Sequence, residues 1–307
     1  MLYQLSYRLA YCESSSIAGW GWCAKAHEKM FRTSVVCHFV LGIPIPYNPA
    51  MALARDRCIC IRKVEYSETS QILTLMGRDH GVLRVIAKGA HRRTKDGHSK
   101  FDGGADLLDV GEAVFTFDPA RELNTLTEWS LREGNLPLRK KLRGMYLGLY
   151  AAELLSVLLQ DNDPHPELFL RFERSLMDLG NEKAEETFLT FQLDLLHQTG
   201  HLAEIDRCVE CGLGAVSDRS AYFSPGRGGT ICENCQGTVH DRIRLDPRLL
   251  RLTQQLLKLP RSNGTPQRLP RLTRHQTDPL NRLFAEQVAH TLGRRLRMPA
   301  YVVGAGK

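Results

Sequence analysis

Two Cys-x-x-Cys pairs constrain this chain of 307 residues more than any other feature. The first pair is Cys208 and Cys211, the second is Cys232 and Cys235, and twenty residues separate the two pairs. Each pair can place two thiolates on one side of a tight turn, so together they supply four tetrahedral ligands for zinc. Glycines after the first pair and before the second provide the turns that a zinc ribbon needs. The spacing therefore predicts a four-cysteine zinc site.

Two other interpretations of the four cysteines are a pair of disulfides and a redox-active Cys-x-x-Cys motif. A redox motif requires one pair at a strand-to-helix turn, whereas this chain has two pairs. Four thiolates leave no open position for water, so we expect the zinc to be structural and not catalytic. The remaining cysteines form no paired framework, which indicates a reducing compartment, the cytoplasm; they are Cys12, Cys23, Cys37, Cys58 and Cys60.

The overall charge favours a polyanionic partner, because the net charge is +7 and the pI is about 9.0. No apolar run approaches the length of a membrane span, so we expect no membrane partner. The chain also lacks a phosphate-binding Gly-x-x-x-x-Gly-Lys-Ser/Thr loop, a His-Glu-x-x-His motif and a Gly-x-Ser-x-Gly motif. We therefore expect a binding protein and not an enzyme.

Residues 1–50 differ from the rest of the chain, with few charged residues and a proline-bearing stretch before Met51. We interpret them as an upstream extension that is not part of the fold, with Met51 as the start. A signal peptide is the alternative, but the charge layout and the lack of a small-residue cleavage site argue against it.

After Met51 the apolar pattern predicts an α+β multidomain chain, in which a small β-barrel precedes an all-helical domain interrupted by the zinc knuckle. Five short segments over residues 51–132 have strand character, at 58–61, 72–76, 82–88, 107–117 and 123–129. In the first of them Cys58 and Cys60 share one face, and Ile59 and Ile61 share the other. Helical spacing then predicts helices at 142–159, 168–179, 185–199, 246–259 and 279–296. The helical domain thus comprises 133–207 and 236–307, with 208–235 as the zinc-binding insertion.

Basic residues gather around the second and third expected strands. Arg78 and Arg84 flank a hairpin turn, and five more cations crowd the loop that follows, namely Lys88, Arg92, Arg93, Lys95 and Lys100. A single-stranded nucleic-acid site on a small barrel needs such cations, with aromatics for base stacking. The aromatic candidates are Tyr66, Phe101 and Phe115, the last of which fits the barrel core equally well. The alternative is a solvated loop, and we interpret two other basic sets as solvated helix ends: Arg139, Lys140, Lys141 and Arg143, and Arg294, Arg295 and Arg297.

The order of barrel, helices, zinc pairs and helices is similar to that of the bacterial DNA repair protein RecO family. The resemblance covers residues 55–298, and residues 81–93 carry its most recognisable stretch. Segments at 126–129, 150–155 and 191–200 and the two cysteine pairs also match the family pattern. The matching starts near Met51, as expected if that residue is the initiator.

This resemblance implies an OB-fold over 51–132 and a recombination mediator of the cytoplasm and nucleoid. Such proteins bind single- and double-stranded DNA, anneal complementary strands without ATP, and act with RecR to load RecA at gaps coated by single-strand-binding protein. Carried over by position, Lys88, Arg92 and Arg93 match the family's basic stretch. One alternative is a zinc-ribbon module that acts on RNA or a transcription complex. Another is a zinc-containing nuclease or a ligase accessory domain.

Overall fold

The structure is a computed structural model that describes residues 52–90, 101–102, 105–214, 221–258 and 270–303. All of these residues belong to one compact unit, Asn48–Lys307. The expectation that residues 1–50 form an extension lies outside the described residues.

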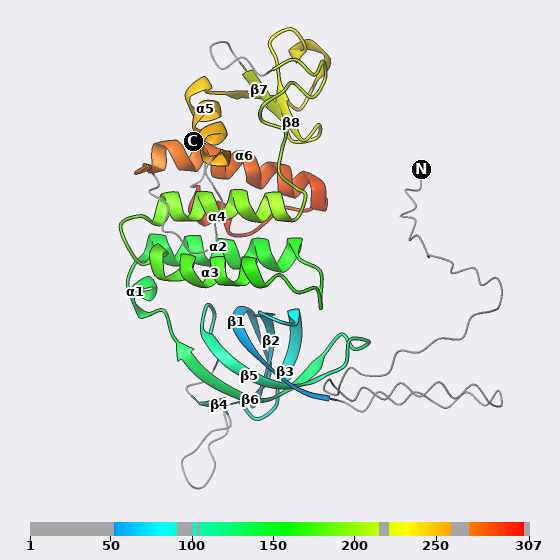
Figure 1. The fold of residues 1–307 in the computed structure, drawn as a ribbon, viewed down its shortest axis with the longest axis vertical. Helices are drawn as coiled ribbons and strands as arrows, with labels where there is room; N and C mark the ends of the chain where they lie inside the picture. Colours follow the sequence, from blue (N-terminus) through cyan, green and yellow to red (C-terminus); the bar gives the residue numbers. More distant parts are fainter. Residues whose placement is uncertain (1–51, 91–100, 103–104, 215–220, 259–269, 304–307) are drawn as a thin grey trace, which may run out of the picture. The chain divides into compact units, whose positions relative to one another are not determined.

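The N-terminal part is a six-stranded sheet that closes on itself (Figure 1). The strand order is β3-β2-β1-β5-β6-β4, and β3 also pairs with β6. The five predicted strands are present, and within the described part of the barrel the sequence pattern missed the two-residue β4. The first strand is much longer than predicted, and the fourth begins three residues late because Leu107 and Leu108 form a turn with Leu108 at φ 66°. The strands are β1 (Ala52–Ser67), β2 (Ser70–Gly77), β3 (Gly81–Ala87), β4 (Phe101–Asp102), β5 (Val110–Phe117) and β6 (Asn124–Glu133).

The centre of β1 is buried on both faces, and its side chains divide between the faces as the alternation predicted. Cys58 and Cys60 point into the barrel interior, where they join a cluster that includes Phe115. Ile59 and Ile61 belong instead to the large core that the helices build. β1 therefore joins the barrel to the helical part, which confirms the predicted fold class of a strand-rich region followed by helices.

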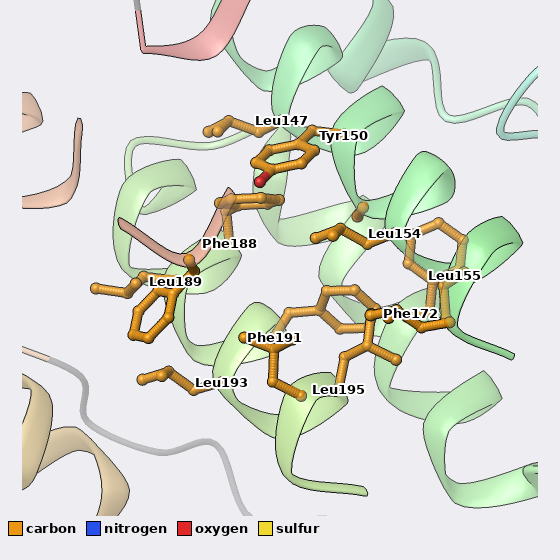
Figure 2. Close-up of a cluster of buried hydrophobic side chains, with 14 of the residues drawn as sticks. Leu147, Tyr150, Leu154, Leu155, Phe172, Phe188, Leu189, Phe191, Leu193 and Leu195 are labelled. Atoms are coloured by element: carbon orange, nitrogen blue, oxygen red, sulfur yellow. The ribbon is translucent and has the colours of Figure 1, made fainter. Parts of the chain in front are cut away.

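Three long helices precede the cysteine pairs, and each lies within two residues of its predicted bounds. They are α2 (Leu142–Leu158), α3 (Pro166–Leu179) and α4 (Ala184–Gln198). Aromatic rings fill the space between them, as Figure 2 shows. The ring centroids of Tyr150 and Phe188 lie 5.1 Å apart, and those of Phe172 and Phe191 lie 5.3 Å apart. The other helices are α1 (Leu136–Arg139), α5 (Pro247–Leu257), α6 (Arg274–Leu292) and α7 (Pro299–Val302).

The prediction that the last long helix starts at Pro279 is wrong. Helix α6 begins five residues earlier, because Thr273 and Gln276 form a capping box that satisfies the first backbone N–H groups. Pro279 lies inside the helix, where it removes one backbone hydrogen bond near the start. The helix ends before Gly293, whose φ of 65° closes the C-terminus.

A second, three-stranded sheet follows the first cysteine pair, where the sequence pattern predicted only a turn-rich insertion. Its order is β8-β7-β9, with β7 (Ala221–Ser224), β8 (Gly229–Ile231) and β9 (Ile243–Leu245). Ala221, Phe223 and Leu245 contribute one face of this sheet to the helical core. These strands have three or four residues each, too short for a period-two pattern to stand out. We call the sheet and the four cysteines the zinc module.

Candidate metal centre and nucleic-acid interface

The four cysteines of the zinc module meet at one point, which confirms the predicted clustering. The Sγ atoms of Cys208, Cys211, Cys232 and Cys235 all lie within 4.8 Å of one another. Cys211 Sγ and Cys232 Sγ are 3.8 Å apart. A tetrahedral zinc with bonds of about 2.3 Å requires sulfur–sulfur edges of about 3.8 Å. The separation of Cys211 and Cys232 therefore matches one edge of a closed tetrahedral site, and no pair of the four sulfurs is more than 4.8 Å apart.

Local turns bring each pair together. In the first pair, the N–H of Gly212 donates to the carbonyl of Cys208 at 2.8 Å, and Gly212 adopts a φ of 73° that suits glycine. The N–H of Cys208 in turn donates to the carbonyl of Leu213 at 2.7 Å. In the second pair, the N–H of Cys235 donates to the carbonyl of Cys232 at 3.1 Å. Each pair thus stands on its own hydrogen-bonded turn.

The electrostatics of the cluster favour a bound cation. Burial raises the pKa of the Cys208 thiol, but N–H groups of Cys232, Cys211 and Glu210 outweigh it and lower the pKa to about 6. A hydrogen bond with Cys232 raises the pKa of Cys235 to about 12. Four thiolates at this separation repel one another, and a divalent ion removes that conflict. The donor set therefore fits a structural metal such as zinc.

The turn between β2 and β3 presents Arg78 at the surface. Asp56, which is buried on β1, fixes this turn with one carboxylate oxygen, Oδ2. That oxygen accepts hydrogen bonds from the backbone N–H groups of Asp79 and His80, both at 3.0 Å. Arg78 itself lies near Asp79, with Nε 3.8 Å from Oδ1.

Arg84 lies on an open part of the barrel's outer face, beside a second arginine that the sequence pattern missed. Thr74 on β2 lies opposite both Arg62 on β1 and Arg84 on β3. Directly opposite residues point to the same face of a sheet. The side chains of Arg62, Thr74 and Arg84 thus form one row across three strands. Simple alternation along β1 would place Arg62 on the same face as Cys60, inside the barrel. A bulge between Cys60 and Arg62 shifts the alternation and places Arg62 on the outer face.

A second row on the same face is apolar. Ile72 on β2 lies opposite both Val64 and Ile86. Val64 is 42% exposed, and the two isoleucines are half-buried. Lys88 is exposed two residues beyond Ile86, and Tyr66 is 65% exposed at the end of β1. We call Arg62, Val64, Ile72, Thr74, Arg84 and Ile86 the open face.

The other predicted contacts divide into two groups. Arg92, Arg93, Lys95 and Lys100 lie outside the described residues. Of the three aromatic candidates, Phe101 and Phe115 are buried in the barrel interior and do not offer a stacking surface. Phe101 lies opposite the buried Trp129 on β6, which explains its inward orientation. Only Tyr66 remains exposed.

The basic set that opens the helical part is structural, so its interpretation as a solvated helix end is wrong for two members. Arg139 Nη2 donates to Asp109 Oδ1 at 2.7 Å and thereby joins α1 to the segment before β5. Arg143 Nε donates to Glu185 Oε1 at 2.6 Å, and its Nη2 donates to Asp278 Oδ1 at 2.7 Å. These guanidinium groups are engaged by acids from distant parts of the chain.

Two family models match consecutive parts of the chain. Residues 51–135 match the model described as "Recombination protein O N terminal", and residues 139–297 match "Recombination protein O C terminal". Among the described helices, none is both long and apolar enough to cross a membrane.

Curated proteins that carry the name DNA repair protein RecO, from several bacteria, are similar to this chain. The protein of Rhodopirellula baltica is 39% identical over 180 residues, which are 58% of this chain and 65% of the relative, slightly less than two thirds of its length. That of Myxococcus xanthus is 29% identical over 82% of this chain and 97% of the relative. That of Rubrobacter xylanophilus is 33% identical over 68% of this chain and 83% of the relative.

Proposed function

The chain belongs to the RecO family, and from this premise we propose that it is a DNA repair protein that acts as a recombination mediator. It binds single- and double-stranded DNA and anneals complementary strands without ATP. With RecR it helps to load RecA at gaps coated by single-strand-binding protein. No bond of the DNA is made or broken in this proposal, so the protein is not an enzyme.

The open face of the barrel is the observation that carries the proposal. It places two exposed arginines beside a half-exposed apolar row. A single nucleic-acid strand needs both features, because cations bind its phosphates and apolar or aromatic surfaces contact its bases. The guanidinium groups of Arg62 and Arg84 bind backbone phosphates, and Tyr66 offers a ring for a base at the edge of the face. Arg78 and Lys88 extend the positive charge at neighbouring turns.

Annealing follows from charge neutralisation. Two DNA strands repel each other through their phosphates, and each phosphate held by an arginine lowers that repulsion. Bases that remain free of the protein then pair with a complementary strand. The four cysteines would hold a structural zinc, whose contribution is to keep the zinc module folded against the helical core.

Substitution of the two arginines on the open face tests the proposal. Arg62→Gln with Arg84→Gln keeps the side-chain length and removes two phosphate contacts. We expect the affinity for a fluorescein-labelled oligo-dT to fall about tenfold, and the slope of log K against log salt to shrink by about 1.4. Fluorescence anisotropy over a salt series measures both quantities.

The matched control is Arg248→Gln, because Arg248 is an exposed arginine on α5 and not on the barrel. It should leave the affinity unchanged. Annealing of complementary strands coated with single-strand-binding protein should follow the same order of variants. A double variant that binds oligo-dT as tightly as the wild type would refute the assignment to this face, and preference for RNA in competition would favour an RNA-binding module.

A further inference from the structure

A cavity of about 180 Å³ lies at the end of the open face. Arg84 of β3, Arg121 of the β5–β6 turn and Asn124 of β6 line it on the barrel side. Asp161 and Asn162, from the loop between α2 and α3, line it on the helical side. The space holds several water molecules or one hydrated anion. It is therefore a polar site between the two parts of the chain and not a packing defect.

The loop between α2 and α3 is held against β3 by its backbone. The N–H of Asn162 donates to the carbonyl of Val82 at 2.9 Å, and Asp161 forms a β-bridge with Val82. Gly81 touches the same loop so closely that an added Cβ would lie 2.3 Å from the carbonyl oxygen of Asp163. The position of Asp161 thus does not depend on its side-chain contacts.

Within this frame Asp161 reaches the arginine of the open face. Asp161 Oδ2 lies 3.2 Å from Arg84 Nη2, and the two side chains are 44% and 52% exposed. Arg121 is 58% exposed and lies 3.2 Å from Asp118 through its Nε and Oδ2 atoms. The charges that line the cavity balance, because Arg84 and Arg121 face Asp161 and Glu122. The cavity has two guanidinium groups but no net positive charge.

We propose that this cavity binds a backbone phosphate of DNA, and that Asp161 competes with that phosphate for Arg84. A carboxylate presents two oxygens to a guanidinium group much as a phosphate does. Arg84 stands in the same row as Arg62, so a strand on the open face delivers a phosphate directly to the cavity. Arg121 is the second donor. The inference rests on the proposed function. It adds an internal competitor, Asp161, that limits the affinity of the protein for DNA.

Asp161→Asn tests the competition, because it removes the charge and keeps the size and the backbone bonds of the loop. We expect the zinc-loaded full chain to bind oligo-dT about two- to fivefold more tightly, the range set by a half-exposed ion pair. The salt slope should steepen by about 0.7, as for one additional phosphate contact. Asp161→Ser should give the same gain, and unchanged thermal melting shows that the fold is kept.

Two controls separate this competition from a general effect of removing negative charge. Glu122 lines the same cavity but makes no ion pair among the described residues, so Glu122→Gln should raise the affinity much less. In the Arg84→Gln background, Asp161→Asn should give no gain. An equal gain in either control overturns the inference, as does an unchanged affinity of both Asp161 variants. Failure of the wild type to bind DNA at all would instead refute the proposed function, and the inference with it.

Discussion

The barrel and the zinc module are two small sheets that each pack one face against the same helical core. They differ in what stabilises the opposite face of each sheet. Each places one face on that core, the barrel through residues such as Ile59 and Ile61, the zinc module through Phe223. Among the described residues, the barrel encloses thirteen buried hydrophobic side chains of its own, including Phe115. On the metal side of the zinc module, the described residues include only three buried hydrophobic side chains, Cys208, Ile231 and Val239.

This difference has an energetic consequence. A fully buried large apolar side chain contributes about 1.5–3 kcal/mol, so the barrel interior stabilises its own sheet. Three residues cannot do the same for the zinc module, and one of them is Cys208 of the cysteine cluster. A structural metal held by the four cysteines would replace a hydrophobic core on that side. We therefore expect one helical core to support one sheet that is self-sufficient and one that depends on an ion.

Removal of the metal should give the largest effect, because structural zinc contributes about 10–16 kcal/mol of apparent binding energy in small domains. Chelation, or Cys208→Ser, should abolish amide-exchange protection in β7, β8 and β9 and leave β1–β3 protected. Hydrogen exchange by mass spectrometry measures both regions. As a control, Cys58→Ala removes a buried thiol of the barrel and should retain one zinc per chain. Loss of protection in the barrel on chelation would show that the barrel also depends on the metal.

Truncation of the barrel core should give the next largest effect. Phe115→Ala leaves a cavity among fully buried side chains and should lower the free energy of unfolding by about 3–5 kcal/mol. Urea unfolding followed by circular dichroism measures the loss, and a metal assay should find the zinc content unchanged. The matched truncation Phe223→Ala, on β7, should instead weaken zinc retention. If both variants lost zinc equally, the two sheets would not be independent.

Acid should lower the stability of the shared helical core, and we expect this effect to be the smallest of the three. Burial raises the pKa of Glu185, but hydrogen bonds from Arg143 and Thr277 and nearby positive charge outweigh it, so the pKa lies below its ordinary 4.5. The carboxylate therefore stabilises the fold above pH 4.5, and this contribution is lost as the pH falls through the lowered pKa.

Glu185→Gln should lower stability near neutral pH by about 1 kcal/mol or less, and the difference from the wild type should vanish in acid. Urea unfolding over a pH series measures this convergence. A difference that stays constant with pH would show that the ion pair does not contribute. Because both sheets pack against the helical core, the loss of stability should be the same for the barrel and for the zinc module.

The features that the sequence predicted correctly depend on local geometry. The alternation of Cys58 and Ile59 determines which face each residue takes, because successive side chains of a strand point in opposite directions. The spacing within each cysteine pair likewise determines the turn that presents both thiols. Where two local signals compete, as at Pro279 and the capping box of Thr273, the pattern misplaced a helix boundary.

Neighbours in the chain therefore define the five longer barrel strands, the three long helices before the cysteine pairs, and the turns that present the four cysteines. Contacts between distant segments determine which arginines are available to a ligand. Arg143 is engaged by Asp278, 135 residues away, whereas Arg62 makes no ion pair among the described residues. Arg84 is intermediate in its availability. The fold brings Asp161 to 3.2 Å from it, but both side chains remain about half exposed. Charge partners of this kind come from distant segments, and no local pattern encodes them.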